Sequence, residues 1–177
     1  LVRACTQAPI VLGGSGFSIF PGDLMSLLGA DFGVVGEGEA MAQLLDALEN
    51  GMDPDVLPGI VTRGGPVRNA VPWPGSVARR LGPKDDHLRF YLEHGGILNL
   101  QTKRGCPYRC IYCTYPHIEG RRLRLVPPDE VAREARELEE LGARYLFITD
   151  SALNTDYDHS LAVARAFRRR RVTIPWG

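Results

Sequence analysis

The sequence predicts an α/β protein made of two regions joined by a short connection. Strand and helix signals alternate over residues 9–71, a stretch rich in proline and glycine follows at residues 72–96, and the alternation restarts at residue 97. The chain has 177 residues, enough for one domain or for parts of two. It opens on Leu1, within what reads as the last turn of a helix, and closes on a strand, so we expect a segment of a longer protein.

The composition excludes several classes of partner. Lys and Arg total 21, as do Asp and Glu, so no overall field favours nucleic acid or an anionic membrane. No apolar run approaches the ~20 residues that a membrane span needs. The sequence shows no signal peptide, and four scattered cysteines do not suggest a secreted disulfide framework. We therefore expect a cytoplasmic protein with neither a nucleic-acid partner nor a membrane span.

Three segments of the first region have strand patterns. "APIVLGG", residues 8–14, is an apolar run ended by two glycines, which is typical of a buried parallel strand. "DFGVVGEGE", residues 31–39, has the same form. Residues 59–69 predict a hairpin that turns at Gly64 and Gly65. Together these segments indicate the later half of a doubly wound domain.

Two helices are expected between these strands. The first begins at Pro21, because proline fits the first helical turn, and ends before Gly29. The second ends before Gly51. Their predicted inward side chains are Leu24, Leu27 and Leu28 in the first helix and Met41, Leu44, Leu45 and Leu48 in the second.

The second region repeats the alternation after a possible short helix at residues 89–94. Strands are expected at residues 97–102, 144–150 and 172–176, and helices from about Pro128 to Gly142 and over residues 157–170. The predicted inward side chains are Val131, Ala135 and Leu138 in the first of these helices and Leu161, Ala164 and Phe167 in the second. This order is the opening of a parallel (β/α) barrel or of an open α/β sheet, in which chemistry gathers at the carboxyl ends of strands.

Three of the four cysteines lie in one loop directly after the first strand of this region. Cys106, Cys110 and Cys113 have the spacing C-x3-C-x2-C, and only Cys5 lies elsewhere. Zinc would need a fourth ligand, for which His117 is available. Incidental surface thiols are a second explanation. A 4Fe–4S cluster held by three thiolates is the third, with one iron open to an external ligand.

The stretch "RGCPYRCIYC", residues 104–113, resembles the signature of the radical S-adenosylmethionine (SAM) superfamily, with Tyr112 as the aromatic residue before the last cysteine. The resemblance implies a 4Fe–4S cluster on Cys106, Cys110 and Cys113, whose open iron is chelated by the amino and carboxylate groups of SAM. In that superfamily an electron from the cluster cleaves the sulfonium, and the released 5′-deoxyadenosyl radical abstracts hydrogen from the substrate. Gly105 and Pro107 are expected to shape the loop around the cluster.

Residues 115–154 extend the resemblance to the cobalamin-dependent branch of this superfamily. There a stretch such as "GRRLR", residues 120–124, leads into the first barrel helix, and the second strand ends in an acidic loop near the methionyl end of SAM. By position this implies that Asp150, Ser151 and Asn154 bind SAM, with Asp150 accepting from the ammonium group, and that Tyr112 lies beside the adenine. The alternatives are that Asp150 and Asn154 cap a helix beginning near Asp156 and that Tyr112 merely packs under the loop.

The glycine-rich strand ends of the first region resemble the second half of a cobalamin-binding Rossmann-like domain. Glycine lets the backbone approach a bulky ligand closely, although many such turns carry glycine for structural reasons alone. The residues implied to bind cobalamin are Gly13, Gly14, Gly16, Gly36, Glu37 and Gly38. The D-x-H-x-x-G motif that supplies a histidine to cobalt in many such domains does not occur in this chain. Its histidines, His87, His94, His117 and His159, all follow these glycines.

The resulting prediction has three parts. Residues 1–71 form the C-terminal part of a Rossmann-like cobalamin-binding domain, residues 72–96 are a linker, and residues 97–177 form the N-terminal part of a TIM-like radical SAM barrel. The cofactors implied are a 4Fe–4S cluster, SAM and cobalamin, and the partners are a small-molecule or lipid substrate and an electron donor such as flavodoxin or ferredoxin.

The function implied is that of a cobalamin-dependent methyltransferase acting on an unactivated carbon, in lipid or natural-product biosynthesis. A cobalamin-dependent cyclase or rearrangement enzyme, and a non-catalytic zinc- or cluster-binding module, are the alternatives. A methylthiotransferase is disfavoured because that class carries a cysteine-rich N-terminal domain, and this N-terminal half has only Cys5.

Several arginine and lysine side chains near these motifs have both a functional and a purely structural explanation. Arg121, Arg122 and Arg124 follow the cysteine loop and are candidates to bind a substrate phosphate or carboxylate, or to form surface ion pairs. Lys103 and Arg104 are candidates to tune the cluster electrostatically, or to be solvated. Residues 168–171, four consecutive arginines, are expected to complement the dipole at a helix end.

Overall fold

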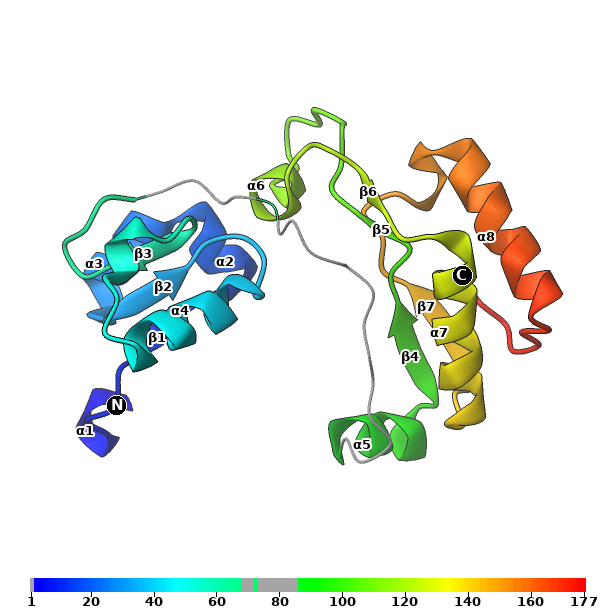
Figure 1. Cartoon of the computed structure of the whole chain (residues 1–177), viewed down its shortest axis with the longest axis horizontal. Helices are drawn as coiled ribbons and strands as arrows, with labels where there is room; N and C mark the ends of the chain where they lie inside the picture. The colour runs from blue at the N-terminus through cyan, green and yellow to red at the C-terminus, as the bar shows by residue number, and fades with distance from the viewer. Residues whose placement is uncertain (1, 68–71, 73–85) are drawn as a thin grey trace. The chain divides into compact units, whose positions relative to one another are not determined.

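A computed structural model of the chain describes residues 2–67, 72 and 86–177, and the chain divides into two compact units (Figure 1). The first contains Leu1–Pro74 and Pro107–Arg121, and the second contains Gly75–Cys106 and Arg122–Gly177. Most of the predicted linker, residues 73–85, lies outside the described residues. Among the described helices, none is both long enough and apolar enough to cross a membrane.

The sheet of the first unit has the order β1-β2-β3, with β1 at Val11–Leu12, β2 at Phe32–Val34 and β3 at Ile60–Thr62. β1 and β2 pair in parallel, as predicted, and β3 pairs antiparallel to β2. The predicted turn after β3 is present, because the Gly65 amide donates to the Thr62 carbonyl at 3.1 Å. No strand follows it in the described residues through Val67, and the rest of the predicted hairpin, residues 68–69, lies outside them.

The described residues of this unit form six short helices. They are α1 at Val2–Cys5, α2 at Gly14–Ile19, α3 at Pro21–Leu28, α4 at Ala40–Glu49, the 3-10 helix η1 at Pro54–Val56 and α6 at Tyr115–Glu119. The predictions of α3 and α4 are confirmed, and Gly29 ends α3 with φ of 61°. The sequence did not predict α2, because its glycines and serines have low helix propensity.

The period of two along the strands divides the apolar side chains of this sheet between two faces. Val35 and Val61 pack with Phe17 of α2 and Met25 of α3 on one face. The other face has its own cluster, formed by Val34, Leu44 and Ile60, beside α4. Helices therefore cover both faces of this short sheet.

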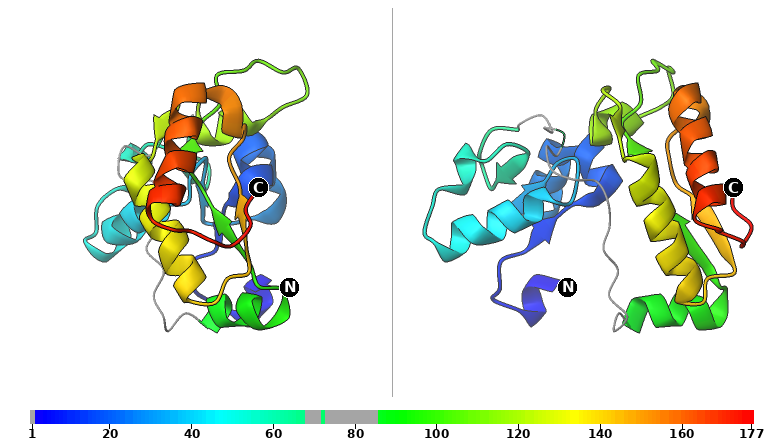
Figure 2. Two further views of the ribbon diagram at one scale, coloured as in Figure 1. Left: turned by 90° about the vertical axis from the view of Figure 1, so that its right-hand side faces the viewer. Right: turned by 45° about the vertical axis from the view of Figure 1, so that its right-hand side comes forward.

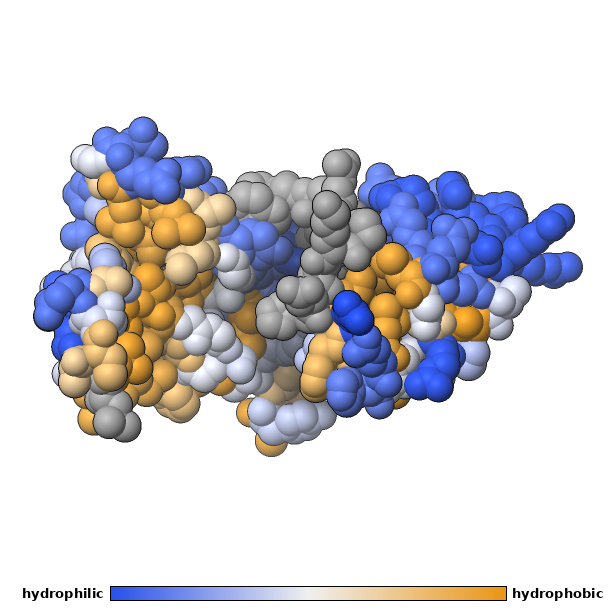
Figure 3. Space-filling view, turned by 90° about the horizontal axis from the view of Figure 1, so that it is seen from below, coloured by the Kyte–Doolittle hydropathy of each residue, from blue (hydrophilic) through white to orange (hydrophobic). Residues whose placement is uncertain are grey.

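The predicted inward faces of α3 and α4 are partly wrong. In α3 it is Met25 that is buried, while Leu27 and Leu28 are 78% and 58% exposed. In α4 the buried residues are Leu44 and Ala47, and Leu45 is 48% exposed. The reason is that each helix contacts the sheet along a stripe narrower than the apolar pattern suggests. Apolar side chains are accordingly exposed on the first unit (Figure 3).

The second unit is built on two parallel strands, β4 at Ile97–Leu100 and β7 at Tyr145–Ile148. Its helices are α5 at Asp86–His94, α7 at Pro128–Glu140, the 3-10 helix η2 at Leu153–Thr155 and α8 at Tyr157–Arg169. The predicted third strand is reduced to one parallel bridge between Leu146 and Trp176. A two-residue antiparallel pair, β5 at Lys103–Arg104 with β6 at Arg124–Leu125, was not predicted.

Helices α7 and α8 both pack on the same face of β4 and β7 (Figure 2). Leu98, Leu100 and Leu146 point into this core, whereas Ile97 and Phe147, on the opposite face, are each 51% exposed. The predicted face of α7 is confirmed, since Val131, Ala135 and Leu138 are buried. That of α8 is shifted: Phe167 is buried as predicted, but Leu161 and Ala164 are half-buried, and the buried set is His159, Val163, Ala166 and Phe167.

The close approach of α2 to the sheet depends on Gly33. A Cβ added at Gly33 would lie 2.0 Å from Cζ of Phe17, which is 3% exposed. We expect Gly33→Ala to displace the ring and to lower the free energy of unfolding by about 1–3 kcal/mol, measured by thermal or denaturant unfolding. Gly16→Ala is the matched control, because a Cβ at Gly16 meets nothing within 4 Å. Equal stability of the two variants would contradict this packing.

Candidate cluster and cofactor site

The cysteine loop begins and ends at a short backbone clamp in the second unit. β5 and β6 pair with Lys103 opposite Leu125 and Arg104 opposite Arg124. The Val126 amide also donates to the Thr102 carbonyl at 2.9 Å. The two ends of the loop are therefore held together by the protein backbone, without any help from the thiols.

The three thiols differ in exposure. Gly105 has φ of 85°, a left-handed conformation that favours glycine, and it turns the chain into the loop. Cys106 comes next and is 7% exposed, Cys113 is half-buried and Cys110 is exposed. The Cys113 amide donates to the Cys110 carbonyl at 3.1 Å, which closes a turn between these two ligand candidates. All of them are free thiols, and within each unit the described residues contain no group of three His, Cys, Asp or Glu side chains placed to bind a metal ion.

The donor set of this loop fits a 4Fe–4S cluster with one open iron, because thiolates are the usual protein ligands of such clusters and there are three of them. His117, the fourth ligand in the zinc alternative, is exposed on α6. Tyr112 is 86% exposed, so the alternative in which its ring packs under the loop is wrong. Arg121 donates from Nη1 to the Tyr108 carbonyl at 3.1 Å and thus ties down part of the loop.

Asp150 lies two residues beyond the end of β7, and its side chain is 0% exposed. Its Oδ1 accepts from the amides of Thr102, at 2.7 Å, and Lys103, at 3.3 Å. Its Oδ2 accepts from the Thr102 hydroxyl at 2.5 Å and from Lys103 Nζ at 3.1 Å. The carboxyl end of β7 is thereby joined to the residues that come after β4.

The other residues of this loop take different positions. Ser151 donates from its hydroxyl to the Gly105 carbonyl at 3.1 Å, next to Cys106. Asn154 is exposed within η2. The alternative in which Asp150 and Asn154 cap α8 is wrong, because Asp156 is the N-cap and accepts from the His159 amide at 2.9 Å.

Sequence reasoning missed Thr102 and treated Lys103 only as a charge near the cluster. The signal was available in the positions of these residues. Thr102 and Lys103 come after one strand, Asp150 comes after another, and the carboxyl ends of neighbouring parallel strands lie at the same edge. A contact between the basic residue after β4 and the acidic residue after β7 could therefore have been predicted.

Four of the six residues predicted to bind cobalamin line a cavity of about 290 Å³ in the first unit. Gly13 and Gly14 follow β1, Gly36 and Gly38 follow β2, and all four line the cavity. The remaining lining residues are Val11, Leu12, Val34 and Met41. Gly16 and Glu37 do not line it, and Glu37 is buried.

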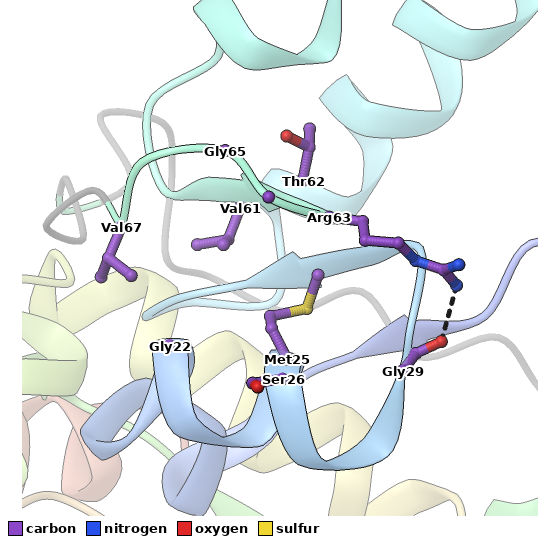
Figure 4. A pocket seen from close by; sticks show the side chains of 10 residues that line it. Gly22, Met25, Ser26, Gly29, Val61, Thr62, Arg63, Gly65 and Val67 are labelled. Carbon is purple, nitrogen blue, oxygen red and sulfur yellow. Dashed lines mark hydrogen bonds between the residues drawn. The ribbon is translucent and has the colours of Figure 1, made fainter.

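A second cavity, of about 420 Å³, lies between α3 and the end of β3 (Figure 4). Met25 and Val61 line it, and the cation at its edge, Arg63, is already engaged. Arg63 Nη2 donates to the Gly29 carbonyl at 2.7 Å and to Asp31 at 2.8 Å. The Asp31 carboxylate also accepts from Arg3 and from the Ile10 amide. These two bonds hold the pKa of Asp31 below its usual value, and the bond with Arg3 has the larger effect.

Comparison with known proteins gives consistent results. Residues 100–174 match the radical SAM superfamily. The chain is 31% identical to tryptophan 2-C-methyltransferase from Streptomyces laurentii over 96% of its own length and 37% of that protein. It is 32% identical to the radical SAM methyltransferase TsrM from Kitasatospora setae, solved with tryptophan and a SAM analogue bound, with a TM-score of 0.79 over 96% of this chain and 35% of TsrM.

A third likeness concerns the fold alone. The cobalamin-dependent SAM radical enzyme OxsB, solved with aqua-cobalamin and SAM bound, is 17% identical, with a TM-score of 0.76 over 99% of this chain and 26% of OxsB. Across these three proteins the chain therefore spans from about a quarter to a little over a third of the relative's length, at 26%, 35% and 37%.

The different exposures of the thiols predict how fast each one reacts with an alkylating reagent in metal-free protein. We expect iodoacetamide to modify Cys106 more slowly than Cys110 by about tenfold or more, because a buried thiol is shielded from the reagent. Peptide mass spectrometry over a time course measures the rates, and exposed Cys5 serves as the internal reference. In denaturant all four should react alike. Equal rates for Cys106 and Cys110 in the folded protein would contradict the placement.

Proposed function

Because residues 100–174 of this chain belong to the radical SAM superfamily, we propose that the protein containing it is a cobalamin-dependent radical SAM methyltransferase acting on an unactivated carbon of a small molecule. The observation that carries the proposal is the three-cysteine loop that follows β4 and the short strand β5, within the residues that match the superfamily. Similarity to tryptophan 2-C-methyltransferase and TsrM along 96% of the chain supports methyl transfer to carbon.

Cys106, Cys110 and Cys113 are proposed to hold a 4Fe–4S cluster. When bound, such a cluster supplies the electron that cleaves SAM. The residues of this chain hold the loop for it: the β5–β6 clamp closes its stem, and Gly105 turns the backbone into it. Lys103 and Arg104, at the clamp, are buried.

SAM is proposed to lie beside this loop and to contact Tyr112, Ser151 and Asn154. The exposed ring of Tyr112 is free to stack on an adenine, and Ser151 already contacts the residue before Cys106. The direct bond from the SAM ammonium group to Asp150 stays a prediction. In the apo chain the Asp150 carboxylate has internal partners on both oxygens.

Cobalamin is proposed to place its nucleotide tail against the glycines of the first unit. The cavity lined by Gly13, Gly14, Gly36 and Gly38 supports this, since residues without side chains let a bulky ligand approach the backbone. When bound, cobalamin supplies the methyl group. Glu37, between Gly36 and Gly38, stays a predicted contact, whereas the cavity gives no support to the predicted contact of Gly16.

The substrate is proposed to come from lipid or natural-product biosynthesis. Arg121, Arg122 and Arg124 are candidates to bind an anionic group on it, although Arg121 also bonds the Tyr108 carbonyl. We further propose that the protein works in the cytoplasm and receives its electron from a flavodoxin or ferredoxin.

The cluster proposal predicts metal content. After anaerobic reconstitution, we expect about four iron and about four sulfide per chain, and a reduced signal in electron paramagnetic resonance (EPR) that changes when SAM is added. Cys106→Ala, Cys110→Ala and Cys113→Ala are each expected to lose most of the iron, while Cys5→Ala keeps it.

Two outcomes would contradict this function. Tight binding of about one zinc per chain with no iron uptake would support the zinc-module alternative. A stable cluster whose EPR signal ignores SAM would point to electron transfer or to a degenerate site. The measurement belongs on the full-length protein containing this chain.

The cobalamin proposal predicts the effect of filling the cavity. A Cβ at Gly38 meets nothing within 4 Å, so Gly38→Leu is expected to fold and to place its side chain in the cavity. Affinity for hydroxocobalamin, followed by its visible spectrum, should fall by roughly tenfold or more, which corresponds to about 1.4 kcal/mol. Gly16→Leu is the matched control, since Gly16 has equal space but does not line the cavity. An equal loss in both variants, or in neither, would contradict this site.

A further inference from the structure

The most deeply buried cation described in the chain is Lys103, which is 1% exposed, and its ion-pair partner Asp150 is 0% exposed. A charged pair without contact with water is costly to bury unless its remaining donors and acceptors are satisfied. Here two of the three ammonium donors and all four carboxylate acceptor positions have partners. Lys103 Nζ donates to Asp150 Oδ2 at 3.1 Å and to the Leu153 carbonyl at 2.6 Å.

The Asp150 carboxylate is saturated by these neighbours. A carboxylate offers about four acceptor positions, two on each oxygen. Thr102 and Lys103 fill them with two backbone amides, one hydroxyl and one ammonium group. Among the described residues these partners leave no acceptor position for the ammonium group of a bound ligand, and the Asp150 side chain is 0% exposed.

These bonds connect the stem of the cysteine loop, at residues 102–103, to the loop of residues 150–155. Lys103 lies in the clamp that leads to the cysteine loop, and through Leu153 it holds the backbone of η2, where Asn154 is exposed. The Ser151 hydroxyl adds a parallel connection to the Gly105 carbonyl. A displacement of either loop would break bonds that both loops need.

We propose that Lys103 and Asp150 are a positioning pair that sets the distance between the stem of the cysteine loop, residues 102–106, and the loop of residues 150–155, so that SAM can contact this second loop beside Cys106. The inference rests on the proposed function, and it assigns Asp150 to holding the cofactor loop in place of direct ligation. Lys103 contributes a charge that neutralises Asp150 and a bond that fixes η2. SAM affinity should then fall when only one member of the pair is replaced, because the other charge is left buried without a partner.

The test is a double-mutant cycle in the full-length, reconstituted protein. Lys103→Met and Asp150→Asn each leave one buried charge without its partner, whereas the double variant removes both. We expect each single variant to weaken SAM binding by about tenfold or more, and the double variant, which has no unpaired charge but still lacks the bond to Leu153, to bind more tightly than either single variant and less tightly than the parent. Titration of the SAM-dependent EPR change measures the affinity, and iron and sulfide contents normalise it to intact clusters.

A direct cofactor ligand would behave differently. If Asp150 accepted from the SAM ammonium group, Asp150→Asn and the double variant would both bind weakly, while Lys103→Met, with its carboxylate released, would bind normally. That pattern overturns the proposal. If the single variants do not fold, Thr102→Val removes one hydroxyl bond to Asp150 in an isosteric side chain and is expected to weaken binding by about threefold. Unchanged binding in Thr102→Val would then count against the pair.

Hydrogen exchange separates this inference from the proposed function. If the parent shows no SAM-dependent signal, the proposed function fails, yet the coupling of the loops can still be measured in cofactor-free protein. Lys103→Met, or Thr102→Val where it does not fold, is expected to raise exchange in residues 150–155 and to leave the middle of α8 protected. Unchanged exchange in residues 150–155 would overturn the coupling itself.

Discussion

The bonds around the buried Asp150 carboxylate are the interaction on which the rest of the candidate site depends. Parallel strands β4 and β7 end at the same edge, and this one side chain joins the segment after β7 to the segment after β4. One consequence is that the stem of the cysteine loop is held before any metal binds. The segment between the two clamp strands, residues 105–123, can then close around a cluster while its ends stay fixed, which reduces the entropy that cluster binding must overcome.

The first unit also has a candidate binding site where two parallel strands end. Its glycines come after β1 and β2 where these parallel strands end, and the absence of side chains leaves a cavity against the backbone. Phe17 and Met25 pack on one face of the sheet, and this packing fixes the start of α2, where Gly13 is the N-cap and Gly14 the first residue. In both units, therefore, packing on the faces of a sheet fixes the loops at its carboxyl edge, where ligands bind in folds of this kind.

The elements that were predicted well are those with strong local signals. Pro21 and Gly29 bound α3, and the helical repeat of Val131, Ala135 and Leu138 gave α7 its buried face. The misses have physical causes. Gly14–Ile19 is helical in spite of its composition because Phe17 packs over Gly33, and the inward face of α8 is set by its packing on the sheet and not by the predicted apolar repeat. Tertiary packing overrode propensity in each case.

By itself, the sequence determined the α/β class, the order of most elements, the cysteine spacing and its place after a strand, because these depend on patterns along the chain. Only the tertiary structure decided that four glycines share a cavity, that Asp156 and not Asp150 caps α8, and that Lys103 and Asp150 meet in the interior. Residues 103 and 150 are far apart along the chain, and their contact is created by strand pairing. The burial that gives this contact its energetic weight is likewise a property of the folded core and not of either residue alone.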